Sequence, residues 1–186
     1  MELVKHYFEY VQNPTQALQN LIKTPSFKQA CWWYLFAALS WVLFFNIGDG
    51  LSVPAFLLKL LIVFAAELTA GTLIAALSGL LLNFRGKNVS PAQLFVLIGS
   101  SGFIKGLLIA FALISTMWPQ ASLWMLAPAA IVLVFALQLV YLTLALRRVS
   151  DTSISLGLLS WLFGILPVGA LFVLLGVFLV WIILLL

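Results

Sequence analysis

Long runs of apolar residues, separated by short polar connectors, occupy most of the chain after its first 28 residues. Five such runs cover residues 29–47, 55–83, 92–116, 122–146 and 155–186. Each run is long enough for the ~20 residues that an α-helix needs to cross the hydrocarbon core of a bilayer. The pattern therefore predicts five transmembrane helices.

The fifth run is longer than a bilayer requires and contains Pro167, with Gly164 and Gly169 close by. Proline removes a backbone hydrogen bond from a helix and often kinks it. Two interpretations remain open for this run. It forms one kinked helix, or it forms a short interfacial piece followed by a 19-residue span from Val168 to Leu186.

Residues 1–28 carry a different pattern, in which apolar residues recur at helical spacing between polar ones. Asn13-Pro14 and Thr24-Pro25 each place a capping side chain before a proline at the first helical position. We therefore expect short amphipathic helices that lie on the membrane surface. Packing of these helices against a soluble partner domain is the alternative.

Composition agrees with a chain that is surrounded by lipid. Hydrophobic residues make up 65% of the sequence, charged residues 8%, and the mean hydropathy is +1.21. Soluble domains have roughly 45–50% and about 25%. These values exclude a disordered or nucleic-acid-binding chain, and the single cysteine, Cys31, excludes a disulfide-stapled fold. The predicted fold class is an all-α integral membrane protein, with interfacial helices in residues 1–28 and a five-helix transmembrane domain in residues 29–186.

The few charged residues predict the orientation. Basic residues gather before the first span and in the connectors that follow the second and fourth spans, whereas the opposite side has only Lys59 and the acidic Asp49. The positive-inside rule then places the N-terminus in the cytoplasm and the C-terminus outside, in the cell (cytoplasmic) membrane. Anionic headgroups should contact the basic side, at about 1 kcal/mol per residue. The predicted contacts are Lys23, Lys28, Arg85, Lys87, Arg147 and Arg148.

Aromatic residues fit the same orientation, because tryptophan and tyrosine are enriched at both membrane–water interfaces. Trp32, Trp33 and Tyr34 are predicted to lie in the aromatic belt on the cytoplasmic side. Trp118 and Trp124 are predicted to lie in the outer belt.

Two charged residues, Glu67 and Lys105, lie deep inside the second and third predicted spans. Counting along the helices from the cytoplasmic ends places Glu67 about 24 Å and Lys105 about 20 Å into the membrane. An unpaired charge at the bilayer centre costs at least ~2.5–3.5 kcal/mol. We therefore expect the two side chains to be partners, unless a water-filled cavity or a neutral Glu67 reduces that cost. The pair serves either as an ion, proton or headgroup pathway, or as a structural pair that fixes the register of the helices.

Small residues at four-residue spacing follow the same two spans and allow close helix packing in lipid. They are Gly71, Ala75 and Gly79 in the second span, and Gly102 and Gly106 in the third. The second and third spans are therefore predicted to pack together through these faces, with the two charges at or near the seam.

The remaining polar residues indicate structural roles and not catalytic ones. Gln138 in the fourth span is expected to bond across helices or to the backbone. A single histidine and a single cysteine cannot form a metal site with the usual number of ligands. The sequence also has no G-x-S-x-G elbow and no phosphate-binding glycine loop. We therefore predict that the protein is not an enzyme and uses no cofactor or metal.

Four short motifs follow one another along the chain: a proline-bearing segment before the first span, a short basic loop, a glycine-serine run and a polar loop before the last span. They are YVQNPT at 10–15, NFRGK at 83–87, GSSG at 99–102 and RRVS at 147–150. With five spans and a cytoplasmic N-terminus, this layout resembles the Yip family of multi-spanning proteins, first recognised through interaction with Ypt/Rab GTPases, and especially its compact bacterial members. The Tyr-Gly-Pro-type signature of eukaryotic members is absent. The resemblance implies a role in membrane organisation or trafficking, acting through lipids or other membrane proteins, without an assigned reaction.

Two functional hypotheses follow. The first is a non-enzymatic Yip-type protein whose partners are membrane lipids, with anionic headgroups at the cytoplasmic face, and a further membrane protein or a second copy of the chain. The alternative is a small transporter, channel or lipid scramblase that uses Glu67 and Lys105 to line its route.

Overall fold

The structure is a computed structural model that describes residues 26–46, 52–117 and 126–185 of the chain. The predicted surface helices and Lys23 lie outside these residues, as do Asp49, Trp118 and Trp124. Within the described residues, every regular element is a helix.

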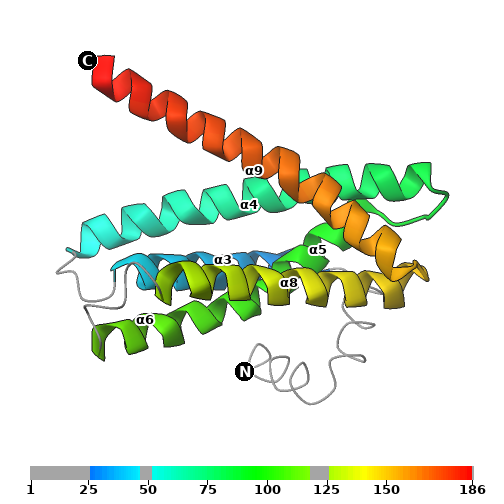
Figure 1. Cartoon of the computed structure of the whole chain (residues 1–186), viewed down its shortest axis with the longest axis horizontal. Helices are drawn as coiled ribbons and strands as arrows, with labels where there is room; N and C mark the ends of the chain where they lie inside the picture. Colours follow the sequence, from blue (N-terminus) through cyan, green and yellow to red (C-terminus); the bar gives the residue numbers. More distant parts are fainter. Residues whose placement is uncertain (1–25, 47–51, 118–125, 186) are drawn as a thin grey trace.

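Successive helices run back and forth along one bundle (Figure 1). The elements are α3 (Phe27–Asn46), α4 (Val53–Phe84), α5 (Pro91–Ser101), the 3₁₀ helix η1 (Gly102–Gly106), α6 (Leu107–Met117), α8 (Ala127–Ser150) and α9 (Ile154–Leu185). Their ends lie within a few residues of the predicted ones, and the predicted start of the fourth span, residue 122, lies outside the described residues. The predicted third span differs in kind, because a 3₁₀ segment divides it into α5 and α6.

Four helical segments are long and apolar enough to cross a membrane: Val53–Phe84, Pro91–Met117, Ala127–Arg148 and Ile154–Phe178. The protein is therefore an all-helical, multi-pass membrane protein by the length and hydropathy of its helices. The first predicted span, α3, has 20 residues but does not join this group. Its first turns contain Lys28 and Gln29, and its aromatic residues are less apolar than leucine or isoleucine.

Helix α3 lies inside the bundle, in contact with α4, α5, η1 and α6. Trp33 and Tyr34 are 5% and 2% exposed, so they pack against other helices of the bundle and do not face lipid or water. The Tyr34 hydroxyl donates to the backbone oxygen of Phe95 at 3.1 Å, which satisfies a polar group that burial would otherwise leave without water. Trp32, which is 48% exposed, is the residue of the three that faces outward.

The basic connectors come together at one end of the bundle, where α3 begins, α4 passes to α5 and α8 passes to α9 (Figure 1). The Lys87 ammonium donates to the backbone oxygen of Asp151 at 2.9 Å and so ties the two connectors to each other. Asp151 ends α8 in the left-handed conformation, with φ of 48°. On the other connector, Ser90 and Gln93 form a reciprocal capping box at the start of α5. We call this region the basic end.

The larger cluster of buried residues also lies toward the basic end. Its largest fully buried side chains include Leu82, Leu94, Leu146 and Trp161, which come from four different helices. All four lie within a few turns of the connectors at 85–90 and 151–153. A smaller apolar cluster, built around Leu108 and Val134, joins α6 to α8 toward the other end.

The small residues do allow close helix approach, but mostly onto α3 and not across the predicted seam. Of the glycines on α4, Gly79 packs against Pro91 and Leu94 of α5 as predicted, whereas Gly71 packs against Tyr34 of α3. Gly102 and Gly106 also face α3, where a Cβ would lie 2.9 Å from the Trp33 backbone oxygen and 3.0 Å from the Phe36 ring, respectively. The prediction of one α4–α5 seam is wrong for these three glycines because α3 occupies that space.

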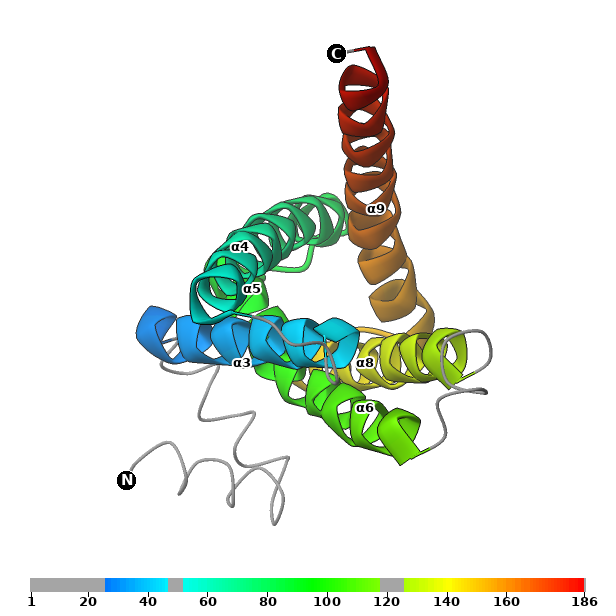
Figure 2. The same ribbon diagram turned by 90° about the vertical axis from the view of Figure 1, so that its left-hand side faces the viewer.

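Helix α9 is a single helix that continues through Pro167. Its first half packs against α4 and α8, and its second half rises away from the bundle (Figures 1 and 2). Leucine, valine and phenylalanine side chains are exposed along that second half, among them Val173, Leu174 and Phe178. Lipid is the natural surrounding for such a surface.

Gly164 and Gly176, both on α9, provide a test of this packing. A Cβ at Gly164 would lie 2.9 Å from the backbone oxygen of Ile74 on α4, whereas a Cβ at Gly176 meets nothing within 4 Å. We expect Gly164→Ala to destabilise the bundle by about 1–3 kcal/mol through overpacking. Gly176→Ala should be neutral or slightly stabilising, because alanine favours helix. Thermal unfolding of both variants in detergent micelles measures the difference, and equal melting temperatures would contradict the described α4–α9 contact.

Candidate functional site

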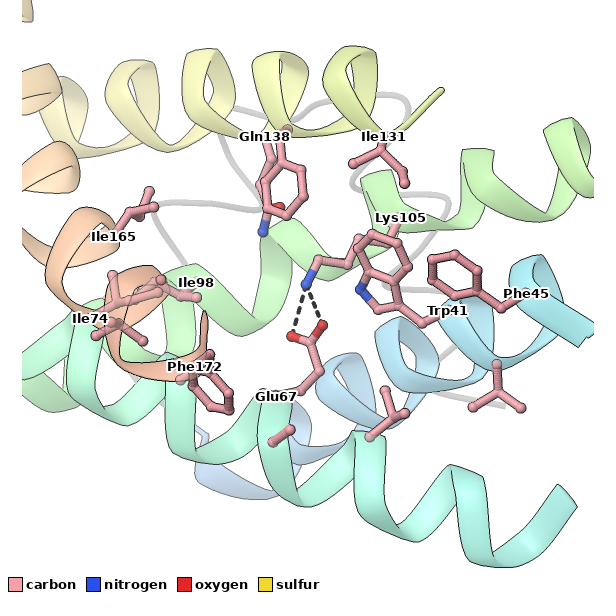
Figure 3. Close-up of a pocket in the computed structure, with 18 of the residues that line it drawn as sticks. Trp41, Phe45, Glu67, Ile74, Ile98, Lys105, Ile131, Gln138, Ile165 and Phe172 are labelled. Carbon is pink, nitrogen blue, oxygen red and sulfur yellow. Dashed lines mark hydrogen bonds and ion pairs between the residues drawn. The ribbon is translucent and has the colours of Figure 1, made fainter. Parts of the chain in front are cut away.

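Glu67 and Lys105 form an ion pair inside the bundle (Figure 3). The Lys105 ammonium donates to both carboxylate oxygens of Glu67, at 2.6 Å to Oε1 and 2.8 Å to Oε2. The Lys105 and Glu67 side chains are 8% and 16% exposed, respectively. The predicted partnership is therefore confirmed. Because each charge compensates the other, the cost of placing either in hydrocarbon is reduced.

The 3₁₀ segment presents Lys105 to α4. Residues 102–106 complete a turn with fewer residues than an α-helix, and the segment is long for a 3₁₀ helix. Glycine at both of its ends lets it lie against Trp33 and Phe36 of α3. Such a break inside a membrane helix often coincides with a functional site.

An aromatic ring provides a further contact for the cation. The Lys105 Nζ lies 5.9 Å from the ring centroid of Trp41 on α3, within the range of a cation–π interaction. Trp41 also stacks on Phe45, with ring centroids 5.7 Å apart. Figure 3 shows these two rings on one side of the ion pair and Ile74, Ile98 and Ile165 on the other.

The ion pair lies in the wall of a cavity of about 870 Å³. Its walls come from α3, α4, α5, η1, α8 and α9. Most of the lining is aliphatic or aromatic, and the polar lining residues are Asn46, Lys59, Glu67, Lys105 and Gln138. Ligand sites in proteins have this size and this character, with an apolar lining and few polar groups.

Gln138 joins α8 to the third span through a side-chain hydrogen bond. Its amide nitrogen donates to the Ser101 hydroxyl at 2.7 Å, and that hydroxyl donates to the backbone oxygen of Ile98 at 2.6 Å. The structure thus brings Gln138 to the same cavity as Glu67 and Lys105 (Figure 3). Its observed bond is the cross-helix contact that the sequence suggested.

Lys59 and Asn46 line the cavity but were not candidates in the sequence analysis. The Lys59 ammonium donates to the Asn46 side-chain oxygen, and the Asn46 amide nitrogen donates to the Val42 backbone oxygen at 2.7 Å. The signal for Lys59 was present, since it is a charged residue near the end of an otherwise apolar run. Nothing in the sequence indicated that Trp41 would lie near Lys105.

The structure also locates the other predicted residues. Among the predicted lipid contacts, Lys28, Arg85, Arg147 and Arg148 are exposed at the basic end, and Lys87 is half-buried. Within the described ranges, no group of three or more His, Cys, Asp or Glu side chains is placed to hold a metal ion.

The comparisons with known proteins give no relatives: no family model matches the chain, and neither a curated protein nor a solved structure matches it significantly.

A double-mutant cycle tests how strongly the pair depends on both charges. Glu67→Gln or Lys105→Met alone should destabilise the bundle by about 3–5 kcal/mol, because each leaves an uncompensated buried charge. The double variant should recover much of that loss, since it removes both charges. Unfolding in detergent measures all four proteins. Additive losses in the double variant would show that the two side chains do not depend on each other.

Proposed function

We propose that this chain is a non-enzymatic, Yip-type multi-pass membrane protein that organises the membrane by gathering anionic lipids at its basic end. The observation that supports this proposal best is that basic residues from three separate parts of the sequence lie at one end of a lipid-facing bundle. They are Lys28, Arg85, Arg147 and Arg148. A basic cluster beside membrane helices attracts anionic headgroups.

The proposal includes a particular topology. In it, α3 is the first of five spans, the basic end faces the cytoplasm, and the C-terminus of α9 lies outside in the cell membrane. The length of α3 supports this, because 20 residues at 1.5 Å per residue reach the ~30 Å of a hydrocarbon core. The alternation of helix direction places the start of α3 and both basic connectors on the same side.

The ion pair supports a structural role better than a conducting one. Both Glu67 carboxylate oxygens accept from Lys105, and the cation also lies over Trp41. Groups that pass an ion or a proton must exchange partners, whereas this arrangement satisfies both charges with protein groups. We therefore assign the pair to holding α4 against η1.

Lipid enrichment tests the basic end. The protein is reconstituted in vesicles of phosphatidylcholine and phosphatidylglycerol at 3:1 and mildly extracted, and the ratio of the two lipids that co-purify is measured. We expect phosphatidylglycerol to be enriched, and Arg85→Gln/Arg147→Gln to lower the enrichment severalfold, since each charge is worth about 1 kcal/mol. Arg85→Lys/Arg147→Lys should retain it, and 1 M salt should reduce it by screening. Enrichment that is equal in all variants, and equal with and without 1 M salt, would contradict the proposal.

One observation favours the second candidate, a transporter, channel or lipid scramblase: Glu67 and Lys105 line a cavity inside the membrane helices. Flux assays discriminate the two functions. Proteoliposomes loaded with an ion-sensitive dye, and others with a labelled lipid, report ion leak and lipid transfer. Our proposal expects wild-type rates equal to those of protein-free vesicles. Transport that Glu67→Gln abolishes in protein that is still folded would establish the alternative instead.

A further inference from the structure

The cavity and the basic end occupy different parts of the bundle, so the cavity is a second feature that lipid gathering does not use. Its lining extends along α4 from Lys59 to Ile74. Those 15 positions correspond to roughly 22 Å along the helix. This length exceeds the ~15 Å of one leaflet's hydrocarbon, half of a ~30 Å core. The cavity is therefore long enough to take an acyl chain that enters from one leaflet.

The lining is suited to hydrocarbon along this length. Aliphatic residues of the lining come from α3, α4, α5, α8 and α9, and aromatic residues come from α3, α8 and α9. Figure 3 shows Ile74, Ile98 and Ile165 together, with Phe172 near them. A void with such walls loses van der Waals contacts when nothing fills it. In a bilayer, acyl chains are the apolar molecules available to fill it.

The charged residues that line the cavity indicate where the headgroup of a bound lipid would lie. Glu67 and Lys105 compensate each other within the wall, so among the cavity-lining residues that the structure describes Lys59 is the charge without an ion-pair partner. Lys59 lies eight residues before Glu67, roughly 12 Å closer to the start of α4. Its side chain is exposed, whereas that of Lys105 is buried. A lysine in this position extends its ammonium to the headgroup level while its stem lies along apolar surface.

The hydrogen-bonding capacity of Lys59 agrees with this placement. An ammonium has three donors, and the structure assigns one of them to the Asn46 side-chain oxygen. Asn46 is itself held by the Val42 backbone oxygen, so it fixes the direction of Lys59. The donors that remain can point to a phosphate.

We infer that the cavity binds one anionic phospholipid from the leaflet opposite the basic end, with its phosphate on Lys59 and one acyl chain along the cavity past the ion pair. The ion pair then contributes a wall that is electrically neutral overall. Arg85, Arg147 and Arg148 do not line this site. Lipid binding in the cavity can therefore be tested independently of the lipid gathering proposed for the basic end.

Native mass spectrometry of the delipidated full-length protein tests the inference. The detergent-purified chain is titrated with phosphatidylglycerol, and separately with phosphatidylcholine. We expect one phosphatidylglycerol to bind more tightly than the others. Lys59→Gln should weaken that binding about fivefold, which corresponds to the ~1 kcal/mol of one lysine near a headgroup. Arg85→Gln/Arg147→Gln should leave this first lipid in place. Equal affinity for the two lipids in wild type would overturn the inference.

Two neighbouring alanines supply a matched pair for the acyl chain. Ala66 lines the cavity, whereas Ala65 is exposed and does not. Ala66→Phe should abolish binding of the first lipid by filling the cavity, and Ala65→Phe should leave it unchanged. If Ala66→Phe fails to fold, chain length serves as the second measurement: lysophosphatidylglycerol with a long chain should compete for the site, and glycerol phosphate should not. Competition by glycerol phosphate alone, or a dimer that no lipid displaces, would show a different occupant.

Discussion

The cost of a charge in hydrocarbon is the constraint on which the rest of the bundle depends. Lys105 can remain 8% exposed within a membrane helix because Glu67 lies 2.6 Å from it. Lys105 lies on the 3₁₀ segment Gly102–Gly106 of the third span, from which its side chain reaches Glu67 on α4. That turn in turn needs glycines, because α3 lies directly against it. The ion pair, the helix break, the two glycines that end it and the helix α3 thus meet at one place in the bundle.

Much of this could be predicted from the sequence. Long apolar runs indicate transmembrane helices because a helix is one of the few backbone structures that lipid allows. The predicted ends of α4 and α9, and the predicted start of α5, lie within a few residues of the observed ones. The Glu67–Lys105 pair was predictable because both residues are charged, rare in such segments and similar in depth. Charge in lipid is a strong signal, since its cost is large compared with that of most other side-chain choices.

The features that could not be predicted are those that depend on which helix packs against a given residue. Glycine spacing indicates that a close approach occurs but does not name the partner, so Gly71, Gly102 and Gly106 were assigned to the wrong seam. Trp33 and Tyr34 have amphipathic side chains that suit an interface as well as a core, and here Phe95 supplies the hydrogen-bond acceptor that allows Tyr34 to be buried. The 3₁₀ turn lies where the third span packs against α3, and the cavity is lined by several helices. No local pattern of residues specifies such contacts between helices.

The attachment of α9 by its first half has a mechanical consequence. A helix anchored at one end and surrounded by lipid at the other is a lever, and its angle responds to how well its length matches the bilayer. Ile165 and Val168 lie in the anchored first half and Phe172 lies in the second half, and all three line the cavity. A change in the angle of the second half would therefore move Phe172 while Ile165 and Val168 stay with the anchored half, so the width of the cavity at that end depends on the angle of α9.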